Sequence, residues 1–186
     1  EPIDILSHLL IGSEGTLGFI AEAVLHTLPD YPFKATGLLY FNSVQEAADA
    51  LVPLTASGAR ALEIMDRASL RSVEDLPGAP AISRHLPPGA AAILVEYQAE
   101  TDSELADFRQ RADHACQNLS LCQPAEFSAD PAIQAALWKL RKGLLPAIGA
   151  ARPQGTSVLI EDVAFPVEQL AQAITDLQAL FVRHGY

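Results

Sequence analysis

The chain has 186 residues, of which 49% are hydrophobic and 19% are charged, a balance typical of a folded globular protein with one domain of ordinary size and a smaller remnant. Acidic residues outnumber basic ones by 23 to 12, and the resulting net charge of −11 disfavours nucleic acid and anionic membrane surfaces as partners. No run of about 18 apolar residues is present, so we expect no membrane span.

The first 30 residues predict the end of another structural unit. Residues 4–10 are expected to form a short helix or turn, and Phe19–Leu28 alternate as a strand does. Between them, Ile11–Ile20 contains three glycines among Ser, Glu and Thr. Such a loop allows positive φ and close approach of a ligand, and a tight turn into the strand is the alternative. Because this motif lies so near the start, and residues 29–32 mark a boundary, we expect the chain to be a piece of a longer protein.

Strands and helices alternate in the rest of the chain. Strands are predicted at 36–41, 59–65, 91–98, 121–127 and 157–165. Helices are expected to begin where a side chain can cap the free amides of the first turn, or at a proline. These starts are Ser43, Asp66, Thr101, Asp130 and Pro166. The first four helices are expected to reach about Ala56, Glu74, Leu119 and Leu145, and Gly185 is expected to end the fifth.

This order of elements predicts an α+β fold of the ferredoxin-like type, with an antiparallel sheet and helices on one face. The sheet is expected to be incomplete at both ends, because the last helix should lead into a further strand. Trp138 is predicted to be a core or interface anchor. Cys116 and Cys122 lack a metal-ligand spacing and are interpreted as small core residues of a reduced protein. A stripe on the last helix is expected to face the core: Leu170, Ile174, Leu177 and Phe181.

Four segments in chain order resemble one known family, the FAD-linked oxidases of the vanillyl-alcohol oxidase and p-cresol methylhydroxylase superfamily. They are Ile11–Ile20, Ala61–Asp66, Leu137–Arg141 and Ile160–Pro166, and the last three resemble the D-lactate and D-2-hydroxyglutarate dehydrogenase branch. The resemblance implies that residues 1–30 are the C-terminal remnant of an FAD-binding domain. Residues 31–186 would be a truncated cap domain that covers the flavin. The long bacterial members, which these motifs resemble most, carry an iron–sulfur domain further downstream.

The resemblance also implies site residues. Arg141 would bind the carboxylate of a 2-hydroxy acid through its guanidinium, although an exposed arginine paired with a surface acid is the ordinary alternative. Asp162 is the second candidate for substrate binding. Glu161 and Asp162 would point to opposite faces of a strand, and capping or surface charge is their other use. The FAD contacts would come from the glycine loop, namely Gly12, Ser13, Glu14, Gly15, Thr16, Gly18 and Ile20.

The intact protein is therefore expected to oxidise a D-2-hydroxy acid by hydride transfer to FAD. Ile160 stands where some relatives carry a lysine, so a dicarboxylic substrate held in that manner is not assumed. No residue is assigned as catalytic base or metal ligand, and the electron acceptor stays open.

We expect a cytoplasmic bacterial protein, with peripheral association with the inner membrane left open, and an inactive fragment that does not bind FAD tightly. The alternative is a non-catalytic α+β module that binds a small molecule or dimerises.

Overall fold

The computed structural model describes residues 1–13, 15–156 and 164–185. Residues 1–30 belong to one compact unit, and residues 31–156 with 165–185 belong to a second. The first unit contains helix α1 (Pro2–Leu10) and the glycine loop. The strand predicted at Phe19–Leu28 is wrong, because this segment has no helix or strand, and Phe19 is 94% exposed. A strand needs a neighbour for its amides and carbonyls, and no described residue pairs with this segment.

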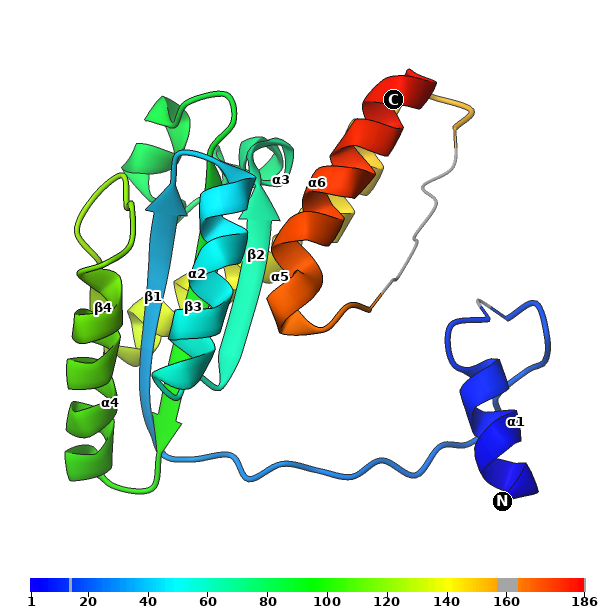
Figure 1. The fold of residues 1–186 in the computed structure, drawn as a ribbon, viewed down its shortest axis with the longest axis horizontal. Helices are drawn as coiled ribbons and strands as arrows, with labels where there is room; N and C mark the ends of the chain where they lie inside the picture. The colour runs from blue at the N-terminus through cyan, green and yellow to red at the C-terminus, as the bar shows by residue number, and fades with distance from the viewer. Residues whose placement is uncertain (14, 157–163, 186) are drawn as a thin grey trace. The chain divides into compact units, whose positions relative to one another are not determined.

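The second unit is built on a four-stranded antiparallel sheet with the strand order β2-β3-β1-β4 (Figure 1). Its strands are β1 (Phe33–Phe41), β2 (Ala61–Asp66), β3 (Ala91–Ala99) and β4 (Phe127–Ser128). The two central strands pair along their whole length, from Phe33 opposite Ala99 to Phe41 opposite Ala91. The strand predicted at 121–127 is reduced to β4 and a single bridge between Leu121 and Phe41.

The helices begin at the residues whose side chains were expected to cap them. Ser43 Oγ accepts a hydrogen bond from Glu46 N at 3.1 Å at the start of α2 (Val44–Ala56). Asp66, Thr101 and Asp130 cap the helices α3 (Arg67–Val73), α4 (Asp102–Cys116) and α5 (Pro131–Ala151) in the same way. Helix α5 continues past the predicted end at Leu145. A short 3₁₀ turn, η1 (Ala81–His85), lies between α3 and β3.

The α+β class and the antiparallel sheet are confirmed, but helices cover both faces of the sheet rather than one. Along β1, Leu39 and Phe41 pack towards α2 and α4, whereas Leu38 and Tyr40 pack in the cluster that includes α3, η1 and α5. Successive side chains of a strand point to opposite faces. Since those of β1 and β3 are buried on both sides, each face requires its own helical layer.

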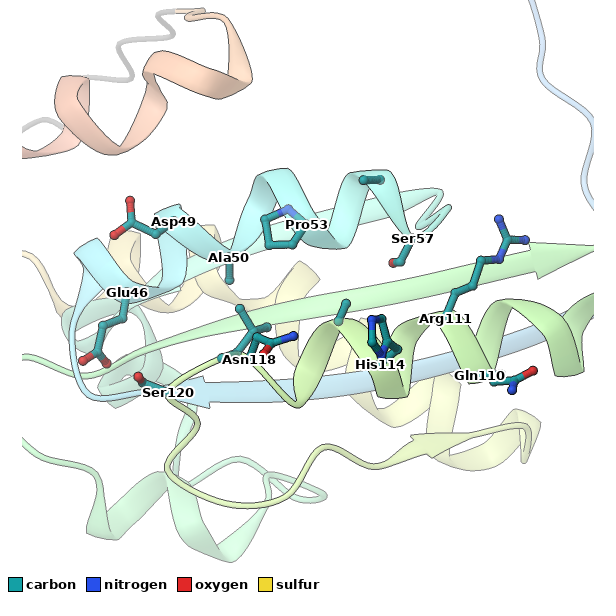
Figure 2. A pocket seen from close by; sticks show the side chains of 13 residues that line it. Glu46, Asp49, Ala50, Pro53, Ser57, Gln110, Arg111, His114, Asn118 and Ser120 are labelled. Atoms are coloured by element: carbon teal, nitrogen blue, oxygen red, sulfur yellow. The ribbon is translucent and has the colours of Figure 1, made fainter.

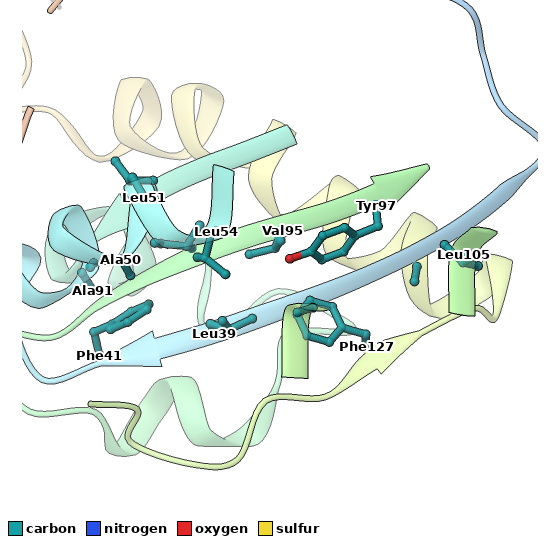
Figure 3. Packing of buried hydrophobic residues seen from close by; sticks show 14 of the residues in the cluster. Leu39, Phe41, Ala50, Leu51, Leu54, Ala91, Val95, Tyr97, Leu105 and Phe127 are labelled. Carbon is teal, nitrogen blue, oxygen red and sulfur yellow. The ribbon is translucent and has the colours of Figure 1, made fainter. Parts of the chain in front are cut away.

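Each face of the sheet buries one tyrosine whose hydroxyl is paired with a serine. On the α2 and α4 side, which Figure 3 shows, Tyr97 packs against Phe127, and its hydroxyl lies 2.7 Å from Ser57 Oγ. On the opposite side, the Tyr40 hydroxyl lies 3.2 Å from Ser83 Oγ. Burial raises the pKa of both tyrosines. The paired serines satisfy phenolic groups that would be costly to bury alone.

The last helix, α6 (Val167–His184), contacts α2 and ends at Gly185 in the left-handed conformation, as expected. Its apolar stripe is buried only in part. Leu170 and Ile174 are half-buried. Phe181, in contrast, is 51% exposed, so its assignment to the core is wrong. Most of the strand predicted at 157–165 lies outside the described residues, and the described residues 164 and 165 are not in a strand.

Replacing Gly37 with alanine is expected to destabilise the sheet. A Cβ at Gly37 would lie 2.6 Å from the carbonyl oxygen of Glu126 and 2.8 Å from the Phe127 ring, so β4 would have to move. We expect Gly37→Ala to lower the free energy of unfolding by about 1–3 kcal/mol, measured by urea denaturation. Gly89→Ala is the matched control, because its Cβ would make only an ordinary contact at 3.6 Å. Equal stability of the two variants would contradict the packing at Gly37.

Cys116 is expected to be poorly reactive in the folded chain. Burial, aided by the Asp113 carboxylate, raises the pKa of its thiol from 9.0 to about 11. Since the thiolate is the nucleophile, this shift lowers its fraction at pH 8 by about 100-fold. Alkylation by iodoacetamide, followed by peptide mass spectrometry, should modify Cys116 far more slowly in the native chain than in urea. Similar rates in the two states would refute this burial. Both cysteines are free thiols.

Candidate functional site

The sheet face under α5 changes from apolar to polar along its length. Leu38 and Leu94 lie in the apolar part, together with Met65. Two residues further along β3, Glu96 takes the place of an apolar side chain and lies opposite Thr36 of β1. The edge strand follows the same change, because Glu63 precedes Met65 by two residues on β2. Side chains two apart share a face, so these polar groups form one polar end of the sheet.

Helix α5 presents a matching set of polar side chains, Gln134, Trp138 and Arg141, which we call the α5 polar row. Their spacing of four and three residues places them along one side of the helix. Gln134 Nε2 donates to the carbonyl oxygen of Lys34 on β1 at 2.8 Å and to that of Ser128 on β4 at 3.0 Å. The first member of the row therefore joins α5 to two strands through their backbones.

The second member, Trp138, donates from Nε1 to Glu96 Oε2 at 2.5 Å. Glu96 is only 5% exposed and receives two further neutral hydrogen bonds, from Thr36 Oγ1 at 3.0 Å and from Gln98 Nε2 at 2.6 Å. Burying a carboxylate is costly unless its oxygens accept such bonds. Trp138 is thus an anchor of α5 on the sheet, as predicted. The sequence reasoning missed Glu96, whose one signal is an acidic residue between Val95 and Tyr97 in an apolar strand.

The third member, Arg141, contacts Glu63 on β2. Its Nε and Nη2 atoms lie 2.9 and 2.7 Å from Glu63 Oε2, and the two side chains are 37% and 35% exposed. Among the described residues, no bond is found for Arg141 Nη1. A guanidinium has five N–H donors in one plane, so this pairing leaves donors for a second carboxylate. The alternative reading of Arg141, an arginine paired with an acidic side chain, is therefore met by Glu63. This pair does not, however, use all of the N–H donors of Arg141. Sequence reasoning missed Glu63 as this partner.

A hollow of about 390 Å³ adjoins the Trp138 indole. It is lined by polar and charged side chains and by parts of α5. Its lining residues are Lys34, Glu96, Pro131, Gln134, Ala135, Trp138 and Lys142. The two lysines give this hollow positive charge beside the buried carboxylate, which suits an anionic or polar ligand better than an apolar one. Asp162, the other predicted substrate contact, lies outside the described residues.

The glycine loop belongs to the first unit and follows α1. Gly12 and Gly15 have φ values of +79° and +75°, and an added Cβ would meet nothing within 4 Å at either position. The positive φ values explain why glycine occupies these two positions. Because no atom lies within 4 Å of the built Cβ, a ligand could approach the backbone there. Thr16 N and Oγ1 both donate to Ser13 O, at 2.9 and 2.6 Å, and stabilise the turn. The loop is compatible with contact to a dinucleotide, although Glu14 lies outside the described residues.

A larger groove of about 870 Å³ lies between α2 and α4 (Figure 2). Its lining residues include Pro53 of α2 and Ser57 at the C-terminal end of that helix, together with Arg111 and His114 of α4. Because α2 and α4 cover the sheet face opposite to α5, this groove is separate from Arg141. In the part of the chain that the structure describes, no group of three or more His, Cys, Asp or Glu could hold a metal ion. No described helix is long and apolar enough to cross a membrane.

Comparison with known proteins shows which family this chain resembles. Residues 31–186 match the family of FAD linked oxidases, C-terminal domain. The chain is 29% identical over 177 residues to the mitochondrial D-lactate dehydrogenase [cytochrome] of Arabidopsis thaliana, covering 91% of this chain and 29% of that protein. It is 31% identical over 149 residues to glycolate oxidase subunit GlcD of Escherichia coli (strain K12), covering 78% of this chain and 28% of the relative.

A third relative is the D-2-hydroxyglutarate dehydrogenase of Pseudomonas putida, which is 28% identical over 198 residues. That match covers 97% of this chain and 19% of the relative. The chain thus spans less than a third of the length of these three relatives. The resemblance to the FAD-linked oxidases is confirmed by the family match, which includes three of the four segments and the strands and helices around the α5 polar row, whereas Ile11–Ile20 lies outside residues 31–186. The chain therefore belongs to the FAD linked oxidases, and residues 31–186 match the C-terminal domain of that family.

Proposed function

We propose that this chain is the cap part of a flavoprotein that oxidises a D-2-hydroxy acid, and that Arg141 binds the substrate carboxylate. The observation that carries the proposal is the half-exposed guanidinium of Arg141, held by Glu63 through Nε and Nη2. The named relatives act on lactate, glycolate or 2-hydroxyglutarate. All three compounds carry a carboxylate beside a hydroxyl-bearing carbon, which is the shared group that a guanidinium recognises.

Arg141 has the role of orienting the substrate in this proposal. A guanidinium that binds both oxygens of a carboxylate fixes its plane, and thereby the direction of the adjacent C–H bond. Glu63 accepts hydrogen bonds from Nε and Nη2, which leaves Nη1 for the substrate carboxylate. FAD, when bound, supplies the acceptor for the hydride. Asp162 is the second proposed substrate contact, and the substrate within the class of 2-hydroxy acids is left to experiment.

The FAD contacts are proposed to come from Gly12, Ser13, Glu14, Gly15, Thr16, Gly18 and Ile20. The positive φ and open sides of Gly12 and Gly15 support this assignment, because accessible amides suit the polar edges of a dinucleotide. The remaining FAD contacts would belong to the rest of the same polypeptide. The proposal also includes an iron–sulfur domain downstream and leaves the electron acceptor unspecified. The proposed location is the cytoplasm, where the protein could associate with the inner membrane.

Loss of the Arg141 guanidinium is expected to weaken substrate binding. In the intact flavoprotein, Arg141→Met should lower kcat/KM for the 2-hydroxy acid by about 100-fold, because a charge-assisted bidentate contact is lost. Rates of flavin reduction under anaerobic conditions would give this ratio. Lys139→Met is the matched control, since it removes an exposed cation of the same helix and should change kcat/KM less than about 2-fold. Equal effects of both variants would refute a specific role of Arg141.

The isolated chain is expected to bind FAD weakly. Helix α1 has no buried residue, and none of the described residues of the glycine loop is buried, whereas tight ligand sites bury most of the ligand. Titration of FAD with this chain, followed by flavin fluorescence, should give no saturable change at micromolar concentrations. Tight, stoichiometric binding would show that the chain holds the cofactor by itself and would contradict the proposed division of the site.

A further inference from the structure

We propose that Glu96 is a positioning residue that sets the orientation of Arg141 through Trp138. This inference rests on the proposed substrate role of Arg141. Glu96 itself need not touch the substrate, because it acts on the helix that carries the guanidinium. The contact that carries the effect is the hydrogen bond from Trp138 Nε1 to Glu96 Oε2, at 2.5 Å.

The register of the sheet places the two carboxylates under consecutive members of the α5 polar row. On β2 and β3, Ala61 pairs with Glu96 and Glu63 pairs with Leu94, so the two glutamates are diagonal neighbours on one face. Trp138 and Arg141 are three residues apart on α5 and share a side of the helix. Each glutamate therefore receives one side chain of the same helix turn.

The carboxylate of Glu96 is better suited to orient helix α5 than merely to hold it against the sheet. Two residues earlier on the same strand face, Leu94 packs in the apolar cluster with Leu140 of α5. Apolar contact is non-directional, and a leucine at position 96 would extend it at less desolvation cost than a buried carboxylate. A hydrogen bond, in contrast, has preferred angles and distances. The bond from Trp138 therefore restrains the rotation of α5 about its own axis.

Arg141 needs such a restraint because its own ion pair is weakly ordering. The Arg141 and Glu63 side chains are 37% and 35% exposed, and ion pairs with this access to water contribute little to fixing a geometry. Glu96 is 5% exposed and is held by Thr36 and Gln98 as well as Trp138. The buried bond of Trp138, three residues before Arg141 on the same turn of α5, thus provides the fixed point that positions the guanidinium.

Two variants test this inference in the intact flavoprotein. Trp138→Phe removes the N–H donor and keeps an aromatic ring, and Glu96→Gln keeps the side-chain shape but leaves a single acceptor oxygen. Each is expected to raise KM for the 2-hydroxy acid and the dissociation constant of oxalate about 10-fold, with kcat changed less than 3-fold. Oxalate binding would be read from the flavin absorbance. The control is Glu100→Gln, an exposed glutamate next to the same strand, which should leave both constants unchanged.

A double-mutant cycle identifies Arg141 as the route of the effect. If Glu96 acts only through Arg141, then Trp138→Phe should raise KM by less than about 2-fold in an Arg141→Lys background. Flavin content and the thermal midpoint of each variant would be recorded beside the kinetics. An unchanged KM with a lowered thermal midpoint would show that the network serves the fold alone, and would overturn the inference.

The remaining outcomes separate this inference from the proposed function. If Arg141→Lys raises KM and Trp138→Phe multiplies that effect independently, the coupling is refuted while the substrate role of Arg141 stands. If Arg141→Lys leaves KM and oxalate binding unchanged, the proposed role of Arg141 fails first, and the inference fails with it.

Discussion

The buried carboxylate of Glu96 is the constraint on which the arrangement of the site depends. It accepts hydrogen bonds from Thr36, Gln98 and Trp138, and so joins two central strands to the helix that lies across them. Apolar packing at the other end of the same face stabilises the contact but, being non-directional, leaves the helix more freedom of rotation than a hydrogen bond does. The polar end removes that freedom, which matters because Arg141 lies on the same turn of α5 as Trp138.

The two faces of the sheet differ in polarity, and the proposed site lies on the more polar one. The face under α2 and α4 is packed with apolar side chains, and its buried hydroxyl, on Tyr97, is satisfied by Ser57. The face under α5 is apolar only in part and carries two acidic side chains, Glu63 and Glu96, beneath polar groups. Such partly polar layers are expensive to bury, and proteins retain them mainly where a specific geometry is needed.

Sequence reasoning succeeded where the physical signal is local. The caps at Ser43 and Asp130 depend on a few consecutive residues, and each lies where it was expected. The strand at Phe19–Leu28 failed because a strand depends on a partner that periodicity cannot supply. Phe181 failed because helical spacing shows which residues share a side, but not how far a neighbouring helix extends. Arg141 was found by resemblance, whereas its contact with Glu63 depends on a pairing 78 positions apart in the chain.

The chain belongs to the FAD linked oxidases. The proposed substrate role of Arg141 connects the chemistry of that family with the geometry of the α5 polar row. The most direct measurement is a crystal structure of the intact flavoprotein with a bound 2-hydroxy acid. The account predicts the substrate carboxylate within hydrogen-bonding distance of the Arg141 guanidinium, with Glu63 still accepting from its Nε. A carboxylate bound elsewhere, with Arg141 directed to solvent, would contradict it.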